Sequence, residues 1–296
     1  AIAAQFEPRT GSWVAQAAGD LRGQYYRYGV EVFVRSVGLV RNLVTDPYSL
    51  SLSADGRRSA LVDLGHARTQ PPGWAGSKPP QTVAAATDMS IYELHVRDFS
   101  ANDRTVPAAL RGKFAAFGEH SSAGMKHLKA LADAGLTDVH LLPVYDFSSV
   151  PETGCSTPSP VGGPADETQQ ALVAATQGSD CFNWGYDPQH FNAPEGSYSS
   201  EANEPFARVR EFRILVQALH QLGLRVGLDV VFNHTSASGQ NERSVLDRIV
   251  PGYYHRLNAE GGIERSTCCE NTATEHLMMA KLMSDSVLLW AREYQI

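Results

Sequence analysis

The chain has 296 residues, of which 43% are hydrophobic and 19% are charged, and its formal net charge is −7. This acidic balance, with no cluster of Lys and Arg, argues against a nucleic-acid partner and is compatible with a neutral substrate. No run approaches the ~20 apolar residues that are needed to cross a bilayer, so we expect no membrane partner.

The pattern of the first part of the chain indicates β-structure. Residues 26–34 mostly alternate between apolar and polar side chains, which is typical of a half-buried strand. A second run, residues 39–44, ends in a Thr-Asp-Pro-Tyr turn. The Pro- and Gly-rich stretch that follows has the composition of a linker. We therefore divide the chain into an all-β part at 1–65, a linker at 66–89 and a larger unit at 90–296.

In the larger unit, strand and helix patterns alternate. Apolar segments at 91–99, 137–143 and 224–232 predict three strands. Amphipathic patterns between and after them predict helices. Repeated strand–helix units predict an α/β fold with a parallel sheet.

Capping residues indicate where two of these helices begin. Ser122 is the expected N-cap of the helix that follows the first strand. Thr272 and Glu275 resemble a capping box, which predicts a final helix running to about Tyr294.

Two connections in the larger unit are long. Residues 144–203 separate the second strand from its helix, and residues 234–271 separate the third strand from its helix. Loops of this length in a compact domain are usually functional. Both follow the carboxyl end of a strand, where (β/α)₈ barrels build their active sites.

The four cysteines are Cys155, Cys181, Cys268 and Cys269, and none forms a Cys-x-x-Cys pair. No ligand spacing supports a zinc site, so we expect no bound metal. A bond between the adjacent Cys268 and Cys269 is disfavoured by disulfide geometry. Isolated thiols, or one bridge within the long loops, remain the two alternatives.

The segment 228–234, Leu-Asp-Val-Val-Phe-Asn-His, is an apolar strand whose end carries three polar side chains. Asp229 offers a carboxylate, Asn233 offers both a donor and an acceptor, and His234 can donate from one ring nitrogen while a neighbour holds the other. The pattern favours binding of sugar hydroxyls. The alternative is a strand that ends in polar residues at a solvated rim.

The segment 182–188, Phe-Asn-Trp-Gly-Tyr-Asp-Pro, places two aromatic residues around a glycine. The apolar face of a glucose ring can stack on an aromatic plane such as that of Trp184 or Tyr186, while nearby polar groups bond its hydroxyls. The alternative is a tight aromatic turn within a structural loop.

These motifs carry a resemblance to a known family. Segment 228–234 is similar to the first signature region of the α-amylase clan. Segment 182–188 resembles the Tyr-Asn-Trp-Gly-Tyr-Asp-Pro signature of pullulanases and limit dextrinases, with Phe182 in the first position. Residues 91–99 and 244–254 are also similar to the family. The chain thus resembles a pullulanase or limit-dextrinase type debranching enzyme over almost its whole length.

The resemblance implies an α/β fold: an incomplete (β/α)₈ TIM barrel, consisting of its first three βα units, preceded by part of an all-β carbohydrate-binding module. Residues 1–65 are then the C-terminal part of a β-sandwich starch-type module, and 90–296 the N-terminal part of the catalytic barrel. The implied activity is retaining hydrolysis of α-1,6 branch linkages in pullulan, amylopectin or limit dextrins. The implied substrate-binding residues are Trp184, Tyr186, Asp187, Asp229, Asn233 and His234.

Retaining hydrolysis needs a carboxylate nucleophile and a carboxylic acid about 5 Å apart. The resemblance implies a nucleophile at the end of the fourth strand, just after Ile296, and further carboxylates beyond it. Asp187 and Asp229 then have supporting roles. We therefore expect no catalytic residue in this chain, no activity of the chain alone, and a missing C-terminal half of the barrel as its partner.

Two alternative functions are a non-catalytic glucan-binding protein and a fragment of an isoamylase or branching enzyme. No cofactor is required for the expected reaction, although the clan allows a structural calcium ion. The resemblance fits secreted or periplasmic bacterial enzymes and plastid enzymes of plants and algae, so it leaves the localisation open.

Overall fold

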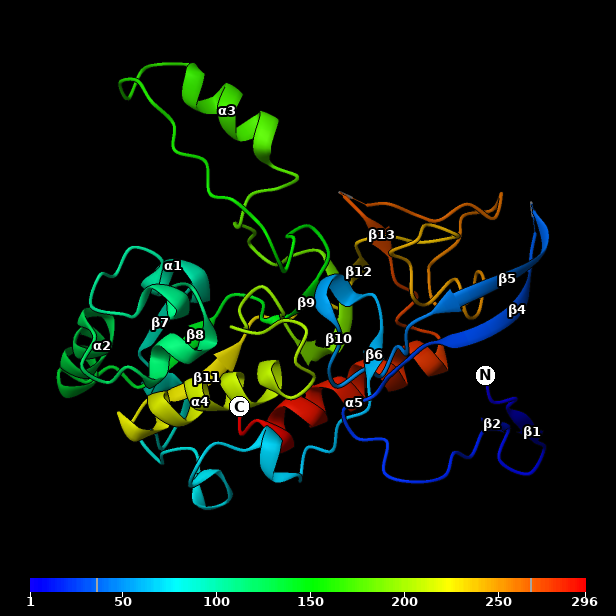
Figure 1. Ribbon diagram of the computed structural model, residues 1–296, viewed down its shortest axis with the longest axis horizontal. Helices are drawn as coiled ribbons and strands as arrows, with labels where there is room; N and C mark the ends of the chain where they lie inside the picture. Colours follow the sequence, from blue (N-terminus) through cyan, green and yellow to red (C-terminus); the bar gives the residue numbers. More distant parts are fainter. Residues whose placement is uncertain (36, 267) are drawn as a thin grey trace.

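The computed structural model describes residues 1–35, 37–266 and 268–296 and shows a mixed α/β chain. Its centre is a parallel sheet with the strand order β11-β8-β7 (Figure 1). The three strands are β7 (Ile91–Leu94), β8 (Asp138–Leu141) and β11 (Arg225–Leu228). The prediction of an α/β chain with parallel strands is confirmed.

The register of the sheet explains its core. Leu94 and Leu228 both pair with Leu141, so the carboxyl ends of all three strands lie at one edge of the sheet. Leu94, Val139, Leu141 and Val226 are buried in the main hydrophobic cluster. Apolar side chains on a central strand stabilise the sheet because both faces are covered.

Each strand is shorter than its apolar segment. The segment 91–99 turns at His95, whose Nδ1 accepts a hydrogen bond from the Asp98 amide at 3.3 Å and opens the short helix α1 (Val96–Ser100). The segment 224–232 leaves the sheet after Leu228. The Asp229 amide still donates to the Leu141 carbonyl. The hydrogen-bonded ladder between β8 and β11 then ends near Pro143, which has no N–H to donate.

Three longer helices follow the three strands along the chain: α2 (Ala123–Asp133), α4 (Ala207–Gln221) and α5 (Leu277–Glu293). Ser122 caps α2 as predicted, since its Oγ accepts a hydrogen bond from the Met125 amide at 3.2 Å. Helix α4 is the most deeply buried and packs its apolar residues into the main cluster.

The capping box predicted for the last helix is wrong. Helix α5 has His276 at its N-cap and no side-chain cap. Thr272 instead donates its hydroxyl to the carbonyl of Phe232 at 2.5 Å, and Glu275 forms an ion pair with Arg256 at 2.7 Å. Both side chains therefore bind residues outside the helix instead of capping its first turn.

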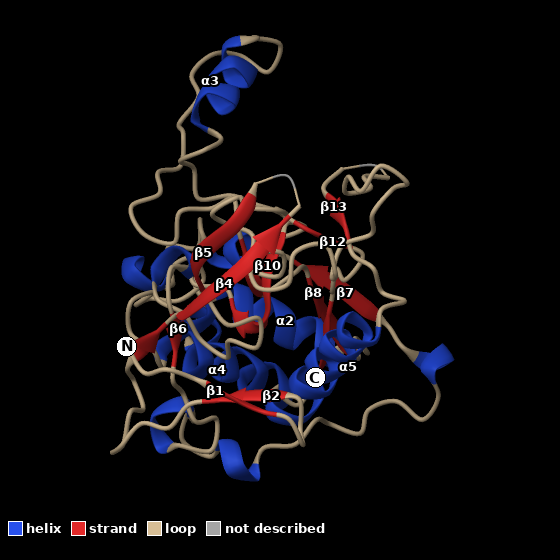
Figure 2. Ribbon diagram, turned by 90° about the vertical axis from the view of Figure 1, so that its right-hand side faces the viewer, coloured by secondary structure: helices blue, strands red, loops and turns tan. Residues whose placement is uncertain are grey.

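The region before the linker contains short antiparallel pairs. The two runs predicted from the sequence correspond to β4 and β5, and the structure pairs these strands antiparallel. The strands are β1 (Gln5–Glu7), β2 (Ser12–Val14), β3 (Tyr25–Tyr26), β4 (Tyr28–Val34), β5 (Gly38–Val44) and β6 (Ser59–Ala60). Figure 2 shows β4 and β5 lying in front of the rest of the chain in that view.

The predicted linker range packs against helix α4. Arg213 of α4 is buried and donates to the carbonyls of Leu64 at 2.8 Å and Thr69 at 3.1 Å. Its guanidinium lies 5.1 Å from the ring centroid of Trp74, which is also buried. Residues 64–74 therefore run along the helix as an ordered segment.

The two long connections contain secondary structure of their own: β9 (Tyr145–Phe147), α3 (Thr168–Thr176), β10 (Pro188–Pro194), β12 (His234–Thr235) and β13 (Glu270–Asn271). Helix α3 stands apart from the rest of the chain in both views (Figures 1 and 2). Short 3₁₀ helices lie at Ala54–Gly56, Ala67–Thr69, Trp74–Gly76, Ala86–Asp88, Ala108–Leu110 and Phe114–Gly118. None of the described helices combines the length and apolarity needed to cross a bilayer.

A buried ionic network joins α4, the long connection and the segment before the linker. Arg208 is fully buried and pairs with Glu152 at 2.8 Å. Glu152 also accepts the amide of Asp55 at 2.9 Å and returns its own amide to the Asp55 carboxylate at 3.0 Å. Burial raises the pKa of Glu152 to about 7, against the opposing effect of Arg208. The network positions β9 and β10, because Asp146 and His190 on these strands form a second buried pair at 2.6 Å.

We predict that Arg208→Ala lowers the free energy of unfolding by about 3–5 kcal/mol, because it leaves Glu152 buried without its cation. Urea denaturation followed by circular dichroism measures this loss. The matched control is Lys129→Ala, which breaks an exposed ion pair with Asp133 and should cost no more than about 0.5 kcal/mol. Equal effects of the two substitutions would contradict the prediction.

Candidate functional site

The aromatic segment 182–188 lies directly over the carboxyl end of β8. Gly185 has a φ of +87°, and a Cβ at this position would meet Pro143 at 2.9 Å. Only glycine fits here, because the backbone is left-handed and approaches Pro143 closely. The Asn183 side chain accepts the Gly185 amide at 2.7 Å and closes the turn. The glycine therefore sets the segment at the edge of the sheet where polar residues follow β11.

Hydrogen bonds connect three of the residues singled out from the sequence. The Tyr186 hydroxyl donates to Asp229 at 2.5 Å. His234 Nε2 lies 2.7 Å from the Tyr186 carbonyl oxygen, which can only accept, so Nε2 is the donor. Desolvation and the Asp229 carboxylate raise the pKa of Tyr186 to about 12, so its hydroxyl stays protonated at neutral pH. Tyr186 is thus fixed at its hydroxyl and at its backbone.

Asp187 belongs to a second group of contacts. Its carboxylate accepts hydrogen bonds from Asn183 at 3.0 Å and from the Ser149 hydroxyl. Burial raises the pKa of Asp187 above its usual value, although these hydrogen bonds act in the opposite direction. This carboxylate holds the aromatic segment against the loop that follows β9.

The remaining two predicted residues are exposed. The Trp184 side chain is 60% exposed, and its ring meets Phe182 edge to face at 6.3 Å between centroids. Asn233 is exposed, and its backbone carbonyl accepts a hydrogen bond from the Thr272 amide at 3.0 Å. The Tyr186 ring is itself 38% exposed. The structure thus presents two aromatic surfaces and several polar groups on strand-end loops.

His95, which follows β7 directly, supports the aromatic segment. His95 Nε2 donates to the carbonyl of Asn183 at 2.7 Å, and its ring stacks on Phe182 at 5.2 Å between centroids. Its position after a parallel strand was the signal that could have indicated this role.

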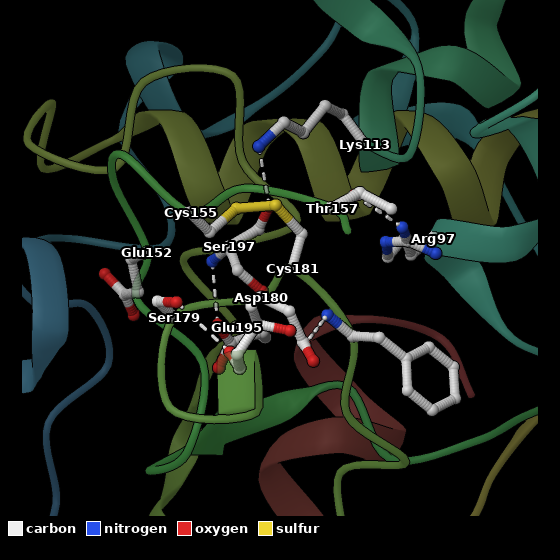
Figure 3. The surroundings of a disulfide bond; sticks show 12 residues. Arg97, Lys113, Glu152, Cys155, Thr157, Ser179, Asp180, Cys181, Glu195 and Ser197 are labelled. Carbon is white, nitrogen blue, oxygen red and sulfur yellow. Dashed lines mark hydrogen bonds between the residues drawn. A yellow bond between two sulfur atoms is a disulfide. The ribbon is translucent and has the colours of Figure 1, made fainter. Parts of the chain in front are cut away.

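A disulfide between Cys155 and Cys181 anchors the start of the aromatic segment (Figure 3). The sequence had left the choice open between isolated thiols and one bridge in the long loops, and the bridge is present. Phe182 follows Cys181 directly, and its amide donates to the Asp180 carboxylate at 2.8 Å. Arg97 donates to Thr157, two residues after Cys155, at 3.0 Å (Figure 3).

Among the described residues, two groups of side chains have the composition of metal ligands. The buried carboxylates Asp146, Glu152 and Glu195 form one group. Its oxygens are already engaged by Arg208, His190 and backbone amides. His234 with Cys268 and Cys269 forms the other group, with donor atoms within 4.8 Å of one another.

No family model matches the chain, but several known proteins are similar to it over nearly its whole length. The chain is 46% identical over 297 residues to pullulanase 1, chloroplastic, of Arabidopsis thaliana, which covers 97% of this chain and 30% of that protein. It is 41% identical over 332 residues to a pullulanase of Klebsiella aerogenes, again with 97% of this chain and 30% of the relative covered. The chain therefore spans about a third of the length of the curated relatives that it matches.

The fold is similar to solved structures as well. A crystal structure of Klebsiella pneumoniae pullulanase complexed with maltotriose matches 99% of this chain and 32% of that chain. The TM-score is 0.91 and the sequence identity is 38%. The likeness thus extends from the sequence to the arrangement of nearly all elements.

We predict that His95→Ala loosens the aromatic segment, because it removes the hydrogen bond to the Asn183 carbonyl and the stack on Phe182. A hydrogen bond contributes a net ~0.5–1.5 kcal/mol, so amide hydrogen exchange in residues 182–187 should become several-fold faster. Mass spectrometry of peptides from this segment measures the rates. The exposed His127 on α2 provides the control substitution, His127→Ala, which should leave these rates unchanged. Unchanged exchange in both variants would show that His95 does not hold the segment.

Proposed function

We propose, on the premise that the chain is homologous to pullulanases along nearly its whole length, that it forms the sugar-holding side of a cleavage subsite in a debranching enzyme. The reaction is retaining hydrolysis of α-1,6 branch linkages in pullulan, amylopectin or limit dextrins. The observation that carries the proposal is the fixed position of Tyr186, whose ring is exposed while Asp229 and His234 hold its hydroxyl and its carbonyl.

A ring fixed in this way is a platform for a pyranose. The apolar face of a glucose residue would stack on Tyr186, and its hydroxyls would reach the polar groups around the ring. Those groups are Asp229, Asn233 and His234. Trp184, more exposed than Tyr186, would contact a neighbouring glucose residue of the same glucan. Rigid aromatic surfaces bind with little loss of side-chain entropy, which suits a long and flexible substrate.

The two carboxylates of the site are proposed to position groups rather than to break the bond. A retaining mechanism requires a nucleophile and an acid about 5–5.5 Å apart on opposite sides of the glycosidic bond. Asp229 accepts the Tyr186 hydroxyl, and Asp187 accepts Asn183 and Ser149. Both are therefore occupied in holding the platform. We propose that the nucleophile and the acid come from a C-terminal half of the barrel, which is the partner of this segment.

We extend the proposal to the architecture. Strands β7, β8 and β11 would be the first three strands of a (β/α)₈ barrel, with α2, α4 and α5 as the helices that follow them. The parallel order β11-β8-β7 supports this arrangement, because successive strands of such a barrel are neighbours. Residues 1–65 would be the C-terminal part of a starch-type carbohydrate-binding module, and residues 66–89 the connection between the two. A calcium ion would have a structural role only.

We predict that the chain binds maltotriose and that Tyr186→Ala weakens this binding at least about tenfold, equivalent to ~1.4 kcal/mol. Trp184→Ala should weaken binding as well. Isothermal titration calorimetry measures the affinities. Tyr92→Ala removes a tyrosine ring that is as exposed as that of Tyr186 but lies beside His127 of α2, and it should leave the affinity unchanged. Binding that is insensitive to the Tyr186 and Trp184 substitutions would remove the basis of the proposed subsite.

We also predict that the 296-residue chain releases no reducing ends from pullulan, because neither Asp187 nor Asp229 is free to act as nucleophile or acid. A reducing-sugar assay with a pullulanase as the positive control measures this. Hydrolysis by the chain that is abolished in Asp229→Asn would contradict the supporting role that we assign to this carboxylate. Binding of maltotriose without hydrolysis is the combination that the proposal requires.

A further inference from the structure

A cavity lies where the end of β5, the loop after β9 and residues 242–248 meet. Its volume is about 620 Å³, and cavities that bind small molecules measure ~300–1,000 Å³. Four of the residues that line it are arginines: Arg27, Arg57, Arg243 and Arg248. From this lining we propose that the cavity binds a phosphorylated sugar.

The charge of the cavity wall favours an anion. The four arginines outnumber the two carboxylates of the wall, Asp55 and Glu242, although the chain as a whole is acidic. Arg57 pairs with Asp55 at 2.9 Å. Among the described residues, no carboxylate forms an ion pair with the other three guanidinium groups, so their charge is available to a ligand.

Main-chain carbonyls orient two of these side chains. Arg243 Nη1 donates to the carbonyl of Ser148, and Arg248 Nη1 donates to the carbonyl of Glu242 at 3.0 Å. These contacts hold the guanidinium groups without neutralising them, and each group has further N–H donors. A phosphate accepts such donors in pairs, because the planar guanidinium matches the spacing of two of its oxygens.

The rest of the cavity wall suits a sugar. Gln189 and Ser244 contribute an amide and a hydroxyl. Within the part of the chain that the structure describes, the Ser244 Oγ has no hydrogen-bond partner. Leu43, Phe147 and Val150 add apolar surface. A few polar groups beside apolar surface are the usual lining of a small-molecule site.

The size of the cavity indicates an organic phosphate rather than the bare ion. A phosphate ion held by the arginines would leave most of the 620 Å³ unfilled. A hexose attached to it brings hydroxyls for the polar groups of the wall and C–H faces for the apolar ones. The acidic chain as a whole disfavours a polyanion such as a nucleic acid, so a ligand with a single phosphate group fits best.

The cavity borders the aromatic segment 182–188. Ser149 lies on the cavity wall, and its hydroxyl donates to the Asp187 carboxylate. A phosphorylated glucose residue of an α-glucan and a free sugar phosphate are the two sources of the ligand, and both present the same group to the arginines. The inference stands on the cavity itself and does not require the proposed hydrolase function.

The test is isothermal titration calorimetry of the chain with glucose 6-phosphate, glucose and inorganic phosphate. We expect one glucose 6-phosphate per chain, with an affinity that falls as the salt concentration rises. A hydrogen bond to a charged group changes an affinity about 10–100-fold. Glucose, which lacks the charge, and inorganic phosphate, which lacks the sugar contacts, should therefore each bind at least about tenfold more weakly.

Maltotriose that carries a phosphate on one 6-hydroxyl distinguishes the two sources. It is titrated into the Tyr186→Ala variant, so that the proposed sugar site contributes little to the binding. Tighter binding than that of glucose 6-phosphate assigns the cavity to a phosphorylated glucan. Equal or weaker binding assigns it to a free sugar phosphate.

Three variants make the assignment specific. Arg27→Gln and Arg243→Gln should each weaken the binding of glucose 6-phosphate about 10–100-fold, because each removes a charged donor from the cavity wall. Arg104→Gln replaces an exposed arginine between α1 and α2 that does not line the cavity, and it should bind glucose 6-phosphate as the original chain does. Circular dichroism verifies that each variant is folded.

The absence of binding to glucose 6-phosphate, or equal affinity for glucose or for inorganic phosphate, would overturn the proposal. So would folded Arg27→Gln and Arg243→Gln variants that bind glucose 6-phosphate as tightly as the original chain. Unmodified maltotriose should bind Arg27→Gln as it binds the original chain. Failure of the phosphorylated-sugar site is therefore distinguishable from failure of the proposed sugar site and of the hydrolase function.

Discussion

The parallel pairing of β7, β8 and β11 is the constraint on which the rest of the structure depends. Parallel strands in register bring their carboxyl ends to one edge, and here Leu94, Leu141 and Leu228 end the three ladders together. His95, Pro143 and Asp229 follow these ladders within two residues. The proposed sugar site is therefore assembled from segments that only this pairing brings into contact.

The same edge explains why the aromatic segment is so firmly held. Gly185 lies against Pro143 after β8, His95 after β7 holds the Asn183 carbonyl, and Asp229 after β11 accepts the Tyr186 hydroxyl. Each of the three strands thus supplies one support. A platform of this kind is pre-organised, so little ordering cost remains when a sugar binds.

Sequence patterns predicted the elements of this arrangement better than their ends. Strand–helix alternation predicted the parallel sheet, because apolar segments and amphipathic helices are local features. The extent of β7 was overestimated because Val96 continues the apolar alternation, whereas His95 caps α1 and turns the chain. The capping box failed because Thr272 and Glu275 have tertiary partners. In the site, motifs indicated Tyr186, Asp229 and His234. They missed the support that His95 gives to the aromatic segment, which depends on a pairing between distant segments.

Tyr186, Asp229 and His234 are proposed to hold one glucose residue of an α-glucan. The most direct measurement is a crystal structure of the chain with maltotriose. We expect a pyranose stacked on the Tyr186 ring, with hydroxyls within hydrogen-bonding distance of Asp229 and His234. Maltotriose bound elsewhere on the chain, with the Tyr186 ring free of sugar, would contradict it.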